Sequence, residues 1–139
     1  MPRLTRWFVK TALVYLVAAL SVWIVEAAQT VLNLPLVIAT LQPTYLHLFT
    51  VGWITQMIFG VAYWMFPRAS RVRPRGSETL AAAVYGLINM GLVLRVIAEL
   101  FRALRPGLVP DWLLTASALL QSLAGVCFVI SIWGRVKEK

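Results

Sequence analysis

Residues 44–67, TYLHLFTVGWITQMIFGVAYWMFP, contain no Asp, Glu, Lys or Arg and hold the single histidine of the chain, His47. At about 1.5 Å per residue, a helix of this length exceeds the roughly 30 Å of hydrocarbon in a typical bilayer. Lipid offers the backbone no hydrogen-bond partner, so a helix is the expected way for such a segment to cross. The stretch therefore predicts a transmembrane helix with one ionisable side chain near its outer end, which is a candidate functional residue.

The composition extends this interpretation to the whole chain. Its 139 residues are 60% hydrophobic and only 13% charged, with a mean hydropathy of +0.81. A soluble domain would have about a quarter of its residues charged. We therefore expect an integral membrane protein with one domain, residues 1–139. The single cysteine, Cys127, excludes an internal disulfide and is expected to pack in the core.

The hydrophobic pattern predicts four membrane spans, near residues 8–28, 44–66, 79–101 and 112–133. The first could instead be a secretory signal peptide, but we expect a retained helix. Residues 29–43 carry two prolines and are expected at the membrane interface, with a turn or two of helix. Ser77 is expected to cap the third span.

The basic residues predict the orientation of these spans. Ten of the 13 lie at the N-terminus, in the loop 68–75 and at the C-terminus. They are Arg3, Arg6, Lys10, Arg68, Arg71, Arg73, Arg75, Arg135, Lys137 and Lys139. The positive-inside rule places all three regions in the cytoplasm, so the net charge of +8 indicates topology and not nucleic-acid binding. The expected fold is all-α: an antiparallel four-helix bundle in the inner membrane of a bacterium, with both termini cytoplasmic.

This topology brings the ionisable residues of the membrane to its outer half. His47 and Glu26 fall at similar depth, and Arg95, Glu99 and Arg102 share one face of the third span because of their spacing. Either Arg95 and Glu99 neutralise each other, or the arginines bind an anionic group.

The helix over residues 44–66 has two distinct faces at about 100° per residue. Gly52, Gln56 and Gly60 form a small-residue stripe, expected to pack closely on a neighbouring helix with Gln56 bonding across it. His47 falls opposite, in line with Val51, Ile54, Ile58 and Met65. That second face is expected to be free for another helix, a second copy of the chain or a flat ligand.

Residues 47–68, HLFTVGWITQMIFGVAYWMFPR, resemble the second helix of the catalytic subunit of heme-copper oxidases, especially of the nitric oxide reductase branch. They also resemble short four-helix bacterial proteins described as oxidase subunit I-like. The matching features are His47, Gly60, Ala62-Tyr63 and Pro67, and the resemblance covers about 24 residues of 139. It implies that His47 is the metal ligand of a b-type heme used for electron transfer or heme handling. One histidine cannot build a binuclear centre, so reduction of oxygen or nitric oxide by this chain alone is excluded.

The sequence allows several roles for His47. In a dimer, two copies of His47 could ligate one heme while Arg95 or Arg102 pairs with its propionates. Alternatively, His47 donates to a backbone carbonyl, pairs with Glu26 or Glu99, or contacts another metal or a quinone. The function is accordingly either heme binding or that of a cofactor-free accessory or assembly subunit of a membrane complex. We expect a homo-oligomer or other membrane subunits as partners, and no nucleic acid.

Overall fold

The computed structural model describes residues 1–66, 76–105, 107 and 111–136, and these residues form helices and no strand. Three of the four candidate spans are single long helices: α1 (Arg3–Ala28), α4 (Glu78–Leu104) and α5 (Asp111–Trp133). The fourth is a composite of a 3₁₀ turn η1 (Leu36–Leu41), α2 (Gln42–His47), a π-helix η2 (Leu48–Thr55) and α3 (Gln56–Met65). By length and composition, all four are able to cross a membrane.

The expected spans are confirmed as helices, but two begin earlier than the hydrophobic pattern indicated. The first starts at Arg3 instead of residue 8, because the long stems of basic residues can lie along a helix while their charges reach water. The second spans Leu36–Met65 instead of residues 44–66. Its extension is the helical turn expected within residues 29–43, and Pro43 is tolerated because it lies at the start of α2. Ser77 caps α4 as expected, accepting a hydrogen bond from the N–H of Leu80 at 3.2 Å.

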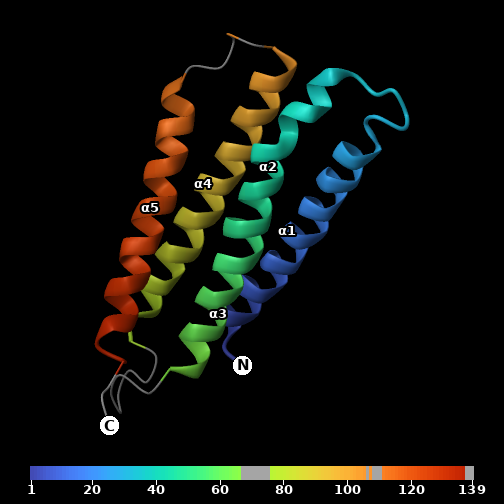
Figure 1. Cartoon of the computed structure of the whole chain (residues 1–139). Helices are drawn as coiled ribbons and strands as arrows, with labels where there is room; N and C mark the ends of the chain where they lie inside the picture. The colour runs from blue at the N-terminus through green and yellow to red at the C-terminus, as the bar shows by residue number, and fades with distance from the viewer. Residues whose placement is uncertain (67–75, 106, 108–110, 137–139) are drawn as a thin grey trace.

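The four helices lie side by side, with α1 packed along η2 and α3, and α5 packed along α4. Figure 1 shows the beginnings of α1 and α4 and the ends of α3 and α5 at one end of the molecule. The structure is therefore two helical pairs in contact. Arginines 68, 71, 73 and 75, which bear much of the orientation argument, lie outside the described residues, as do Pro67, Lys137 and Lys139.

The contact between α1 and the second span follows the small-residue stripe. A Cβ added to Gly60 would lie 2.6 Å from the Cβ of Phe8, and one added to Gly52 would lie 2.8 Å from the Cβ of Tyr15. Gln56 is fully buried between them, and its Nε2 lies 3.5 Å from the carbonyl oxygen of Phe8. The prediction that this stripe is a close helix contact with Gln56 bonding across it is confirmed.

The two helical pairs meet in an apolar cluster near the end where α1 begins, which we call the Phe8 cluster. Its buried members are Phe8, Phe59, Val84, Ile88 and Ala124. Cys127 packs against it, as expected for a core residue, and the rings of Phe59 and Phe128 stack with centroids 3.8 Å apart.

Beside the Phe8 cluster, a buried arginine ties the end of α5 to the end of α3. Arg135 donates to the carbonyl oxygens of Tyr63 and Phe66, at 3.1 and 2.8 Å. The carbonyls at the end of an α-helix have no partner within the helix, so a cation is favourable there. Arg135 was expected only to set the membrane orientation. It also satisfies carbonyl groups at the end of α3.

Candidate functional site

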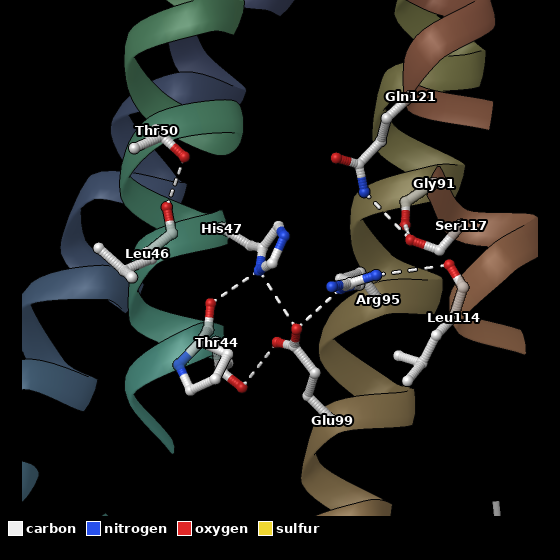
Figure 2. A network of polar contacts seen from close by, with 11 residues as sticks. Thr44, Leu46, His47, Thr50, Gly91, Arg95, Glu99, Leu114, Ser117 and Gln121 are labelled. Carbon is white, nitrogen blue, oxygen red and sulfur yellow. Dashed lines mark hydrogen bonds and ion pairs between the residues drawn. The ribbon is translucent and has the colours of Figure 1, made fainter. Parts of the chain in front are cut away.

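A group of polar side chains joins the two helical pairs toward the other end of the molecule. Thr44 and His47 project from α2, and Arg95 and Glu99 project from α4 to meet them (Figure 2). We call these four residues the His47 cluster. All four lie within helices able to span a membrane, where ionisable groups are rare and usually functional or paired.

Glu99 is the centre of the cluster, because each of its oxygens has a partner (Figure 2). Its Oε1 accepts a hydrogen bond from Nε of Arg95 at 2.8 Å and lies 3.2 Å from Nδ1 of His47. Its Oε2 accepts a hydrogen bond from Oγ1 of Thr44 at 3.0 Å. The Glu99 side chain is only 10% exposed. A carboxylate held this far from solvent needs these donors, since an unpaired buried charge is very costly.

Arg95 carries the polar contacts across to α5. A second nitrogen of its guanidinium, Nη1, donates to the carbonyl oxygen of Leu114 at 3.4 Å. One helical turn further along, Ser117 donates to the carbonyl oxygen of Gly91 at 2.9 Å and accepts from Gln121 at 3.1 Å (Figure 2). A polar seam thus runs along the contact between α4 and α5, and Arg95 joins it to the His47 cluster.

The contacts of His47 identify which of its ring nitrogens carries a proton. Nδ1 lies 2.8 Å from the carbonyl oxygen of Pro43, one helical turn earlier, and 3.2 Å from the Glu99 carboxylate. Both oxygens are acceptors, so a hydrogen bond to either requires a proton on Nδ1. In a neutral imidazole the lone pair is then on Nε2. A neutral His47 therefore takes the Nδ1–H tautomer, which leaves Nε2 available as an acceptor or a ligand.

The π-helix η2 explains why the expected face of His47 differs from the observed one. Residues of a π-helix advance by less than 100° each, because its hydrogen bonds span five residues instead of four. Ile58 and Met65, expected in line with His47, are 56% and 70% exposed, whereas His47 turns toward Glu99 on α4. At the level of His47, the occupant of this face is another helix, α4, which was the first of the three expected occupants.

Of the remaining predicted site residues, one pair lies in the His47 cluster and two residues lie apart from it. The neutralising pair of Arg95 and Glu99 is confirmed. Arg102 does not join the cluster: its NH1 lies 3.4 Å from Oδ1 of Asp111, and both side chains are largely exposed. The Glu26 carboxylate makes no ion pair or hydrogen bond with any described residue, so it is not the partner of His47.

The structure identifies two partners in the cluster that the sequence did not specify. A backbone carbonyl was one of the expected partners of His47, and it is that of Pro43, four residues earlier. The Thr44 hydroxyl, which donates to Glu99, was not predicted. Spacings of four and three residues place both groups on the side of the helix that carries His47, and that spacing is the signal the sequence offers.

Two hollows lie near the cluster, and neither is lined by the His47 ring. One has a volume of about 350 Å³ and is lined by Thr40, Pro43, Glu99, Arg102 and Ala103. The other, about 440 Å³, is an almost wholly apolar groove along α4 that begins at Asn89. Within the described residues, no three His, Cys, Asp or Glu side chains gather as a metal site would require. A heme at His47 would find no second histidine in the same chain.

Comparison with known proteins adds no relative. No family model, curated protein or solved structure matches the chain. The resemblance of residues 47–68 to the heme-copper oxidases accordingly stays a prediction.

Proposed function

We propose that the chain is a single-domain membrane protein of the bacterial inner membrane, with its helices antiparallel and both termini in the cytoplasm. The basic residues of the N-terminus, of the loop 68–75 and of the C-terminus support this orientation. The common end shared by the start of α1 and the end of α5 agrees with it. The His47 cluster then lies toward the outer surface.

We propose further that His47 binds the iron of a b-type heme through Nε2. The observation that carries this proposal is the pair of acceptors around Nδ1 of His47. Histidines that ligate metals usually donate their other ring N–H to a carboxylate or a backbone carbonyl, and Nδ1 of His47 has one of each within 3.2 Å. When bound, the heme would supply one-electron chemistry.

The chain's own residues would hold and orient such a group. Glu99 and the Pro43 carbonyl fix the ring of His47, and Arg95 holds the Glu99 side chain in place. Arg102, on the rim of the 350 Å³ hollow, is the cation best placed for a heme propionate, because its ion pair with Asp111 is exposed to solvent whereas Arg95 is paired with the largely buried Glu99. The sequence contains no second histidine, so a second histidine ligand would have to come from His47 of another copy of the chain.

A hemin titration of the purified protein tests this proposal. The wild type should develop a Soret band that saturates, and His47→Ala should lose it while keeping its helical circular dichroism. The matched control is Ser21→Ala, which removes an exposed hydroxyl on α1 that donates to the Val17 carbonyl, away from the His47 cluster. Saturable binding that survives in His47→Ala would overturn the assignment.

A cofactor-free accessory or assembly subunit is the second candidate. The observation in its favour is that Glu99 is satisfied by Thr44, His47 and Arg95 without any ligand. The cluster would then serve only to hold the two helical pairs in register. A wild-type protein that takes up no heme, and that co-purifies with a fixed membrane partner, would favour this function.

A further inference from the structure

A second hollow of mixed character lies far from the His47 cluster, at the end where α1 and α4 both begin (Figure 1). Its volume is about 520 Å³, the largest among the hollows described here. It is lined from α1 and its preceding residue by Pro2, Arg3, Leu4 and Trp7, and from α4 by Glu78 and Ala82.

The walls of this hollow carry opposite charges that do not pair. Arg3 contributes a guanidinium from α1 and Glu78 a carboxylate from α4. Neither makes an ion pair with the other or with any other described residue. The hollow therefore presents a separated cation and anion to whatever enters it.

The rest of the lining is apolar and extends toward the membrane. Trp7 is 53% exposed, and its ring centroid lies 6.0 Å from that of Tyr85 on α4. Tryptophan is typical of the level at which lipid head groups meet acyl chains. Leu4 and Ala82 complete an apolar wall below the two charges.

We propose that this hollow binds the head group of a zwitterionic phospholipid with a primary amine, such as phosphatidylethanolamine. The phosphate suits Arg3, because guanidinium groups bind phosphate oxygens through several N–H donors. The ammonium suits Glu78 as a hydrogen-bond acceptor, and the glycerol and first methylenes lie against Trp7. This proposal is independent of the role of His47.

The proposed preference for a zwitterionic lipid differs from the preference for anionic lipids that the net charge alone would predict. A chain of net charge +8 attracts anionic lipids in general. In this hollow, however, Glu78 repels a head group that carries no positive charge. A trimethylated amine lacks the N–H donors that Glu78 would accept, so phosphatidylcholine should also bind less well.

Native mass spectrometry of the delipidated full-length protein tests this inference, with ethanolamine, choline and glycerol phospholipids of identical acyl chains. The wild type should bind the ethanolamine lipid about tenfold more tightly than the other two, as one charge-assisted hydrogen bond allows. Arg3→Gln should weaken all three lipids. Glu78→Gln should remove the ethanolamine preference, and Glu78→Asp should restore most of it. The pair of variants distinguishes binding of the ammonium by Glu78 from a purely structural role of Glu78 in the first turn of α4.

The controls are Arg6→Gln, which removes a charge from the same turn of α1 outside the hollow, and Glu26→Gln at the opposite end. Both should keep the wild-type preference. Tightest binding of the glycerol lipid, or an unchanged preference in Glu78→Gln, would overturn the proposal. Equal competition by free phosphoethanolamine would overturn it as well, because the hollow would then take a water-soluble zwitterion.

Discussion

The two ends of the contact between the helical pairs use opposite chemistry. At the end where α1 begins, the pairs meet through the Phe8 cluster of buried apolar residues. At the other end they meet through the His47 cluster, in which Glu99 accepts from three donors. In lipid, apolar contact between helices gains little from the hydrophobic effect, because acyl chains are equally apolar. The Phe8 cluster therefore depends on close fit, and the His47 cluster on paired charge.

This contrast bears on function. A contact that depends on fit has no reason to include ionisable groups, and the buried members of the Phe8 cluster include none. The guanidinium of Arg135, buried beside this cluster, binds the carbonyls at the end of α3, a helix-end role that the fold itself explains. The His47 cluster keeps a carboxylate, a guanidinium and an imidazole at membrane depth, where such groups are costly. Holding two helices together is possible without that cost, so the His47 cluster is the better candidate for a site.

The largest expected effect comes from removing the carboxylate of the polar end. Glu99→Ala leaves Arg95 largely buried without its partner, and should lower the free energy of unfolding by about 3 kcal/mol. Equilibrium unfolding in mixed micelles with increasing dodecyl sulfate measures it. The control Glu99→Gln keeps volume and an acceptor and should lose less. An Ala variant as stable as the wild type would show that charge does not hold this end.

A smaller loss is expected from a single methyl group at the apolar end. Gly60→Ala places a Cβ 2.6 Å from that of Phe8, an atom too near the backbone to swing away. Overpacking of this kind should cost about 1–3 kcal/mol in the same unfolding assay. Gly86 is the matched control, since a Cβ there meets nothing within 4 Å and the exchange to alanine should be neutral or stabilising. Equal effects at the two glycines would contradict the role of close fit.

The polar seam between α4 and α5 should contribute least to the free energy of unfolding. Ser117→Ala removes one hydrogen bond to the Gly91 carbonyl and one from Gln121. Hydrogen bonds between membrane helices average about 0.6 kcal/mol, so a loss near 1 kcal/mol is expected. Ser122→Ala, at an exposed position of the same helix, should change nothing measurable in that unfolding assay. A loss as large as that of Glu99→Ala would place the main polar support in the seam instead of the cluster.

The sequence predicted the helices well, because uninterrupted apolar stretches such as residues 112–133 leave few alternatives in a membrane. The ion pair of Arg95 and Glu99 was predictable for a similar reason, since a spacing of four residues places two side chains together on any α-helix. The direction of the His47 side chain was not predictable from the sequence. It depends on η2, where a π-helix replaces the α-helix and changes the angle between successive residues.

The π-helix has no signal in the hydrophobic pattern, since every residue from Leu48 to Ile54 is compatible with an α-helix. Two threonines support it in the structure. Thr55 donates to the Thr50 carbonyl, five residues earlier, at 2.9 Å, and Thr50 donates to the Leu46 carbonyl. Such back-bonding is a local property of the folded helix and is hidden from periodicity.

The most direct test of the central claim uses the fact that His47 is the only histidine. Protein labelled with ¹⁵N-histidine in lipid nanodiscs gives one imidazole spin system, whose nitrogen shifts report which ring nitrogen is protonated. The account predicts a protonated, hydrogen-bonded Nδ1 and a bare Nε2, with Nδ1 shifting in Glu99→Gln. A proton on Nε2, with or without one on Nδ1, would contradict it, because His47 would then have no lone pair facing away from Glu99 to offer a ligand.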